Sequence, residues 1–169
     1  MNAFLDEIGI CCFTEEMQNP ILWAHYAGSY TGICAEFRTT DDTTHLFSHI
    51  ARVTYTPHCP TIRASQTGAL GTVYGDRKDW GYIAQHGVCT KSADWSVERE
   101  WRWWITEAAG RFKGVPARAI RRIFLGPNAT AETKSKVVKA AIRAGAQIPV
   151  FETKLSVTDF RVDKGPKLS

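Results

Sequence analysis

The sequence has no apolar run of about 18 residues or more, the length that a membrane-spanning helix needs. We therefore expect no membrane span and no membrane partner. The first residues also lack a basic leader and a small-residue cleavage site, which argues against a secretory signal and favours a cytoplasmic protein. A glycine-rich phosphate loop and the Gly-x-Ser-x-Gly turn of the α/β-hydrolases are both missing. The sequence thus disfavours phosphate-loop nucleotide-binding enzymes and hydrolases with a serine elbow.

Cysteine is present but lacks the patterns that give it a structural role. The 5 cysteines are an odd number at irregular spacing, and no Cys-x-x-Cys pair occurs among them. A disulfide framework and a structural zinc site are both poorly supported by such a distribution. Buried free thiols in a reducing cytoplasm fit it better.

The composition is that of a globular protein of modest charge. Of the 169 residues, 44% are hydrophobic and 22% are charged, and the net charge is +4. A charge this small is compatible with a phosphate-bearing partner but does not identify a nucleic-acid-binding protein. The length, with no repeat or low-complexity linker, predicts a single domain over residues 1–169, with a core at about 8–163 and a loose tail at 164–169.

Apolar runs of strand length outnumber helical patterns, which predicts an α+β fold with a mainly antiparallel sheet and a few flanking helices. Thr130 as an N-cap and Gly145 after the last turn mark the clearest helix. Helices are expected at 20–27, 41–49, 76–86 and 130–144, and an irregular connection at 57–75. Strands are expected at 9–13, 32–38, 50–56, in the tryptophan-rich stretch 91–104, and at 111–115, 119–125, 148–155 and 160–163.

The tryptophan-rich stretch, residues 91–104, holds four of the six tryptophans together with alternating carboxylates and guanidiniums. In a strand, alternate side chains share a face, so Trp101 and Trp103 point one way. The other face then carries Glu98, Glu100, Arg102 and Trp104. The two carboxylates would lie about 6.5–7 Å apart along the strand. The stretch therefore predicts a charged site supported by an apolar face.

Six stretches, in this order, resemble the bacterial family catalogued as domain of unknown function 2971. They are Ile10–Glu15, Trp23–Ala27, Gly32–Phe37, Val53–Tyr55, Lys91–Arg102 and Ala119–Gly126. Members of that family usually carry a further segment ahead of the first of these motifs, so the resemblance implies a shortened member or a fragment. It also implies a bacterial or phage origin, and it brings no known function.

Glu98-x-Glu100 also resembles the motif of arginine-directed ADP-ribosyltransferases. The resemblance implies that one glutamate engages the nicotinamide ribose of NAD while the other activates the acceptor. It further implies that Thr14 belongs to a hydroxyl-bearing strand and that His25 and Tyr26 lie near the ribose. A strand-borne carboxylate can stabilise the oxocarbenium-like charge that develops when a glycosidic bond breaks. No residue matches the arginine on the first strand of that fold.

The predicted site combines these residues. The catalytic candidates are Glu100, Glu98, His25 and Glu36, and the candidates for contact with a nucleotide are Tyr26, Arg102 and Thr14. Glu36 could orient the imidazole of His25 as a general base. NAD is a candidate substrate, and no further cofactor is expected. In the alternative interpretation, Glu98, Arg99, Glu100 and Arg102 form an ion-pair ladder along an exposed strand, and His25 is a hydrogen-bonded core or rim residue.

Two other groups of residues suggest weaker functions. His45 and His49 are four residues apart, but no glutamate lies between them and no third ligand is evident, so no metal is expected. A basic group that could contact phosphates consists of Arg118, Arg121, Arg122, Lys134 and Lys139. Such a group is also typical of a solvated helix face. The alternative to an enzyme is therefore a non-catalytic module that binds nucleic acid or a protein.

Overall fold

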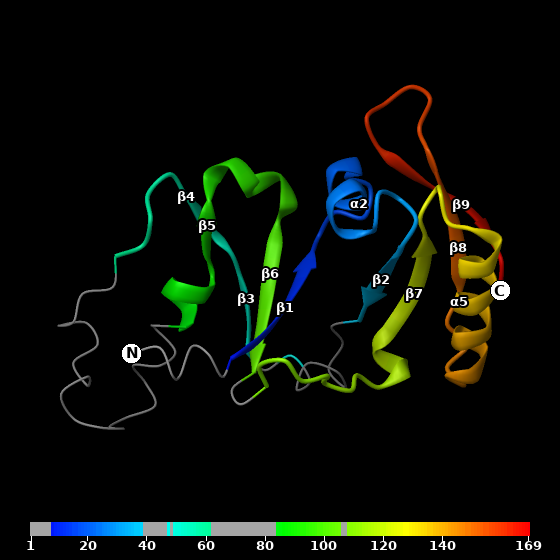
Figure 1. Ribbon diagram of the computed structural model, residues 1–169, viewed down its shortest axis with the longest axis horizontal. Coiled ribbons are helices and arrows are strands. Elements are labelled where there is room, and N and C mark those ends of the chain that lie inside the picture. Colours follow the sequence, from blue (N-terminus) through cyan, green and yellow to red (C-terminus); the bar gives the residue numbers. More distant parts are fainter. Residues whose placement is uncertain (1–7, 39–46, 48, 62–83, 106–107) are drawn as a thin grey trace. The chain divides into compact units, whose positions relative to one another are not determined.

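The computed structural model describes residues 8–38, 47, 49–61, 84–105 and 108–169 (Figure 1). The chain divides into two compact units, Met1–Glu15 with Ser48–Phe112 and Glu16–Phe47 with Lys113–Ser169. Each unit is described by itself. Helices and mostly antiparallel strands occur in the same chain, which confirms the α+β prediction. The single-domain prediction stays a prediction.

The first unit contains a three-stranded antiparallel sheet whose central strand is β6 (Glu100–Ile105). On one side β6 pairs with β1 (Gly9–Thr14), which confirms the strand predicted there, and on the other with β3 (Ile50–Arg52). The register of β1 places Cys12 opposite Arg102. Because β6 is the central strand, Arg102 lies in the middle of the sheet, beside Cys12 of β1.

The strand predicted at 50–56 is divided between two sheets. Its first part is β3, whereas β4 (Thr54–Thr56) pairs in parallel with β5 (Thr90–Ser92). The change occurs at Val53, whose N–H donates to the carbonyl of Glu100 at 2.9 Å. The N–H of the next residue, Thr54, donates to the carbonyl of Cys89 at 2.7 Å. The prediction of one continuous strand is wrong because consecutive residues bind different neighbours.

The tryptophan-rich stretch is only partly a strand. Residues Ala93–Glu98 form the 3₁₀ helix η3, which begins where the Ser92 hydroxyl accepts from the N–H of Asp94. Arg99 then adopts a left-handed conformation, with φ 45°, and β6 begins at the next residue. Glu98 therefore lies at the end of a turn, and its predicted place on the strand is wrong.

The second unit contains a four-stranded sheet in the order β2 (Ile33–Phe37), β7 (Ile120–Leu125), β8 (Val150–Leu155) and β9 (Val162–Lys167). β7 and β8 are parallel and are connected by helix α5 (Ala131–Arg143), while the other two pairs are antiparallel. The Thr130 hydroxyl accepts from the N–H of Thr133 at 3.1 Å, so the predicted N-cap is confirmed.

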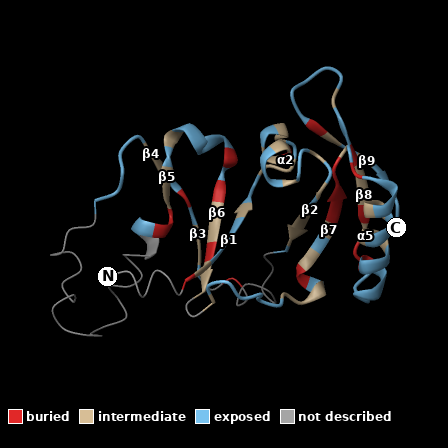
Figure 2. Ribbon diagram, viewed as in Figure 1, coloured by how far each residue is buried: buried red, intermediate tan, exposed pale blue. Residues whose placement is uncertain are grey.

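The core of the second unit lies on both faces of β7, as the buried residues of Figure 2 indicate. Leu125 packs with Val150 and with the apolar side of α5. Phe124, which points to the opposite face, packs with Trp23 of α2 (Pro20–Tyr26), the helix predicted at 20–27. Ile142, also on α5, has a side chain that is 67% exposed.

Two further predictions in the C-terminal third need correction. Residues 111–115 form no strand, and Gly110 before them lies in a turn with φ 67°. The tail at 164–169 is not loose, because β9 continues to Lys167 and pairs with β8. Short helical turns also occur at η2 (Ala84–Val88) and η4 (Ala117–Ala119).

The remaining secondary-structure predictions concern parts that the structure describes little or not at all. The predicted helix at 41–49, most of that at 76–86 and most of the connection at 57–75 lie outside the described residues. Among the helices in the described ranges, none is long and apolar enough to cross a membrane.

Candidate functional site

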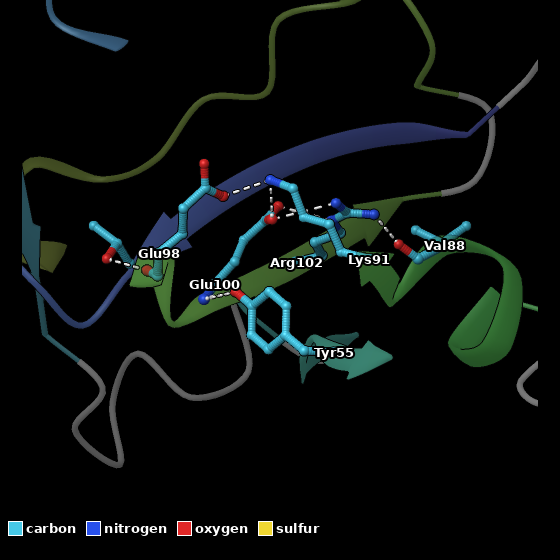
Figure 3. A network of polar contacts seen from close by, with 7 residues as sticks. Tyr55, Val88, Lys91, Glu98, Glu100 and Arg102 are labelled. Atoms are coloured by element: carbon cyan, nitrogen blue, oxygen red, sulfur yellow. Dashed lines mark hydrogen bonds and ion pairs between the residues drawn. The ribbon is translucent and has the colours of Figure 1, made fainter. Parts of the chain in front are cut away.

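Four charged side chains form a network in the first unit: Lys91, Glu98, Glu100 and Arg102 (Figure 3). The carboxylates are the most deeply buried, with 4% and 5% of their side chains exposed, against 20% for the lysine and 17% for the arginine. Two negative and two positive charges balance. We name these four residues the charge network.

Lys91, on β5, joins the two carboxylates of the charge network. Its Nζ donates to Oε2 of Glu98 and, at 3.0 Å, to Oε2 of Glu100. The same nitrogen lies 5.1 Å from the ring centroid of Trp95, within the range of a cation–π contact. One ammonium group therefore occupies the position where the two carboxylates converge.

Arg102 binds Glu100 from two residues along the same strand face. Its Nε donates to Oε1 at 2.7 Å, and its Nη2 donates to Oε2 at 3.2 Å. Its Nη1 donates to the carbonyl of Val88. The guanidinium is thereby anchored at both ends, which fixes the orientation of the Glu100 carboxylate.

Neighbouring strands hold the backbone on either side of Arg99. The Tyr55 hydroxyl, from β4, accepts from the N–H of Glu100 at 2.8 Å. The Thr14 hydroxyl, from the end of β1, donates to the carbonyl of Glu98 at 2.6 Å. The left-handed residue is thus held from two strands, so the two glutamates keep fixed positions relative to each other.

The surroundings of Glu100 keep its carboxylate ionised. Burial alone would raise its pKa, but hydrogen bonds from Arg102, Cys12 and Lys91 outweigh burial and lower the pKa to about 2. Burial would likewise lower the pKa of Lys91, yet its contacts with the two glutamates raise it above the ordinary value. At neutral pH Glu100 and Lys91 are therefore charged, and Glu100 can stabilise a positive charge but has no proton to donate.

The thiol of Cys12 stays protonated beside these ions. Burial and the hydrogen bond to Glu100 raise its pKa to about 12. The thiolate is the nucleophilic form of cysteine, so Cys12 serves here as a hydrogen-bond donor. The expectation of buried thiols holds for Cys89, whereas Cys11, Cys12 and Cys59 are exposed free cysteines.

The second unit holds the other predicted site residues. His25 and Tyr26 end helix α2 with ring centroids 6.3 Å apart, and Tyr26 is largely exposed. Glu36, on β2, is paired with Arg121 at 3.0 Å and with Arg122 at 2.6 Å. Orientation of His25 by Glu36 stays a prediction.

The predicted site residues are thus divided between the units. Glu98, Glu100, Arg102 and Thr14 belong to the first unit, and His25, Tyr26 and Glu36 belong to the second. The structure brings the first group together through hydrogen bonds. A single site made from both groups stays a prediction.

The alternative interpretation was an ion-pair ladder along an exposed strand. It is wrong about the exposure, because Glu98 and Glu100 are buried. The sequence interpretation also missed Lys91 as the partner of both carboxylates. Lys91 belongs to the same stretch, but the need for a second cation arises only because the carboxylates are buried, which the sequence does not show. Tyr55 carries no signal either, since only the pairing of β4 brings it near.

Several cations of the basic group already form ion pairs with carboxylates. Arg121 and Arg122 bind Glu36, and Lys134 lies 2.5 Å from a carboxylate oxygen of Glu152. These contacts reduce the positive charge that the group presents to a phosphate. His45 lies outside the described residues, and those described contain no cluster of three side chains suited to a metal.

Comparison of the chain with protein-family models, with curated proteins and with solved structures finds no match in any of the three. The geometry of the charge network is therefore the basis for a functional proposal.

Proposed function

We propose that this protein is an enzyme that transfers a glycosyl group from a nucleotide-type substrate, with NAD as the candidate donor. The observation that supports the proposal is that the carboxylates of Glu98 and Glu100 meet on a single ammonium group. The pair is thus arranged to hold one positive charge between two negative ones. Cleavage of a glycosidic bond develops such a charge on the sugar.

In the proposed reaction, the bond between the ribose carbon and the nicotinamide nitrogen breaks, and its electron pair leaves with nicotinamide. The ionised Glu100 stabilises the oxocarbenium-like charge on the ribose. Glu98 accepts the proton of the acceptor while the acceptor bonds to the ribose carbon. Lys91 must leave its position for the sugar to enter, and its partial exposure gives it a path to solvent.

The other residues have supporting roles in this proposal. Arg102 holds the carboxylate of Glu100 in orientation, and Thr14 holds the backbone of Glu98. His25 and Glu36 stay predicted catalytic candidates, and Tyr26 stays a predicted nucleotide contact. A pKa of about 2 suits Glu100 to an electrostatic role and not to general acid catalysis.

Release of nicotinamide from NAD tests the proposal. We expect the wild-type chain to release nicotinamide, with agmatine as an arginine-like acceptor or with water. Glu100→Gln should lower the rate at least about 100-fold, the size expected when a group that stabilises transition-state charge is removed. Glu98→Gln should reduce transfer to agmatine more than hydrolysis, because Glu98 is assigned to the acceptor.

Glu15→Gln is the matched control. Glu15 is a glutamate of the same unit that binds an arginine, Arg52, at 2.8 Å, but it lies outside the charge network. This variant should keep the wild-type rate. Absence of nicotinamide release from the folded wild-type chain, or an equal loss in Glu15→Gln and Glu100→Gln, would contradict the proposal.

We also propose membership of the family of unknown function 2971, and with it a cytoplasmic bacterial or phage origin. Support comes from the order of the six motifs, which occupy β1, α2, β2, β4, the η3–β6 segment and β7. Three of the motifs belong to the first unit and three to the second. Sequencing of neighbouring genes or of longer homologues would test the membership.

A further inference from the structure

The connection between β8 and β9 displays two fully exposed apolar side chains. Val157 is 100% exposed and Phe160 is 101% exposed, and Leu155 at the end of β8 is half exposed. In Figure 1 this connection extends beyond the ends of β2 and β7 of the same sheet. Residues 155–161 are called the hairpin tip below. Apolar side chains gathered at a projecting turn are typical of a contact surface.

The hairpin tip is held in shape by its own polar groups. The Ser156 hydroxyl accepts from the N–H groups of Thr158, at 3.4 Å, and Asp159, at 3.3 Å. The N–H of Ser156 donates to the carbonyl of Arg161 at 2.9 Å, which closes the turn. Val157 and Phe160 are therefore presented by a preformed loop, so binding through them loses little conformational entropy.

The carboxylates of this hairpin are already paired. Arg161 lies 3.5 Å from Asp159 and 2.8 Å from Asp163. Glu152 pairs with Lys134 of α5. Each of these three carboxylates thus has a cationic partner within the second unit, although Asp159 and Asp163 share Arg161.

Three lysines of the hairpin keep their charge uncompensated. No carboxylate in the described part of the chain forms an ion pair with Lys154, Lys164 or Lys167. Lys164 instead lies 3.7 Å from the ring centroid of Phe151. The second unit as a whole has 13 Lys and Arg against 8 Asp and Glu, a net charge of +5, whereas the first has 8 against 9, a net charge of −1. The apolar tip is therefore flanked by positive charge.

We propose that the second unit docks on an anionic lipid surface through the hairpin tip. Val157 and Phe160 enter the boundary between headgroups and acyl chains, while Lys154 and Lys164, which lie next to the tip on β8 and β9, contact lipid phosphates. This is a peripheral contact that needs no membrane-spanning helix, so it departs from the expectation of no membrane partner but not from that of no membrane span. It is independent of the proposed glycosyl transfer.

A lipid surface fits the hairpin tip better than a macromolecular partner does. Two side chains bury only a few hundred Å², roughly half of the 800 Å² that each partner of a stable protein interface contributes. Val157 and Leu155 are aliphatic and cannot stack on bases, which a single-stranded nucleic acid would require. A fluid lipid surface can accommodate the small apolar hairpin tip, and its anionic headgroups attract the lysines around the tip.

Flotation of the full chain with vesicles tests this proposal. We expect binding to vesicles of equal parts phosphatidylglycerol and phosphatidylcholine and at least about tenfold weaker binding to phosphatidylcholine alone. Val157→Ser with Phe160→Ser should reduce binding to the anionic vesicles about tenfold or more. Phe112→Ser is the matched control, because Phe112 is equally exposed but belongs to the first unit. It should bind as the wild type does.

A second variant keeps the test decisive if the double serine variant loses its fold by circular dichroism. Lys154→Gln with Lys164→Gln should weaken binding to anionic vesicles and leave binding to neutral ones unchanged. No binding of the wild-type chain to anionic vesicles overturns the proposal, as does an equal loss in Phe112→Ser. Binding to single-stranded oligonucleotides but not to vesicles, lost in the double serine variant, would assign the tip to nucleic acid instead.

Discussion

Arg102 donates through Nε to Oε1 of Glu100 at 2.7 Å, although the two residues belong to the same strand and are separated by one residue. Alternate residues of a strand share a face, so this pairing depends only on local geometry. A third partner, Lys91, reaches the same carboxylate from β5. The ion pair of Arg102 with Glu100 thus forms within one strand, and Lys91 connects this pair to β5.

Removal of Glu100 should strongly destabilise the first unit. Glu100→Ala leaves Lys91 and Arg102 as partly buried cations without their shared partner, so we expect a loss of about 3–5 kcal/mol in the free energy of unfolding. Urea denaturation measures it. Glu132→Ala, which removes an exposed pair with Lys136 on α5, should cost less than about 1 kcal/mol. Equal losses in the two variants would contradict the assigned burial.

The stability contributed by Glu100 should disappear in acid. Its pKa in the folded protein is lowered to about 2 from an ordinary value of 4.5, so the stabilisation is complete above pH 4.5 and is lost as the pH falls toward 2. The difference in unfolding free energy between the wild type and Glu100→Gln should be constant from pH 6 to 8 and shrink below 4.5. Urea titrations at each pH measure it, and a difference that grows in acid would refute the ionised state.

A methyl group at Gly126 should not be tolerated. A Cβ there would lie 2.0 Å from the carbonyl oxygen of Tyr30, and backbone cannot move as a flexible side chain does. Gly126→Ala should therefore lower the free energy of unfolding by about 3 kcal/mol or more. Gly114→Ala, whose Cβ would meet nothing within 4 Å, is the control and should change it by less than about 1 kcal/mol. Thermal unfolding of the two variants and of the wild type measures these changes, and equal losses in the two variants would contradict the prediction.

The hydroxyl of Thr130 should stabilise the start of α5. Thr130→Ala removes the acceptor for the N–H of Thr133, and the expected loss is about 1 kcal/mol. Thr130→Ser keeps an acceptor at the same position and should retain most of the stability. Chemical denaturation followed by circular dichroism compares the two. A serine variant as unstable as the alanine variant would show that the methyl group, and not the cap, matters at this position.

The parts of the fold that follow local rules could be predicted from the sequence. Helix α5 begins at a capping threonine and ends before Gly145, which has φ 68°, and both signals are contained within the helix and its ends. Strands β1, β2 and β7 are short apolar runs bounded by polar or turn residues. For these elements, tertiary contacts agree with local preference.

Elements whose conformation depends on distant partners could not be predicted. The stretch at 164–167 contains Gly165 and Pro166, which favour a turn, yet it pairs with β8 as part of β9. Arg99 has a side chain that disfavours positive φ, so nothing in the sequence indicated the break before Glu100. Its conformation is held by bonds from β1 and β4 to its neighbours.

The sequence predicted several residues of the candidate site, but it did not predict that the carboxylates are buried or that Lys91 binds both of them. Glu98, Glu100 and Arg102 do lie together, because they are close in the sequence. Their burial and the role of Lys91 follow from the pairing of β4 with β5, which is a long-range property. The sequence shows which residues carry charge, but it does not show which of these side chains are exposed to solvent.

The change of partner at Val53 also affects how the first unit opens. The N–H groups of Val53 and Thr54 bind β6 and the residue before β5, so neither sheet can release this segment without straining the other. Amide hydrogen exchange at these two positions should consequently require one shared opening event and proceed at similar protection. Two adjacent peptide units therefore couple the opening of one sheet to the opening of the other.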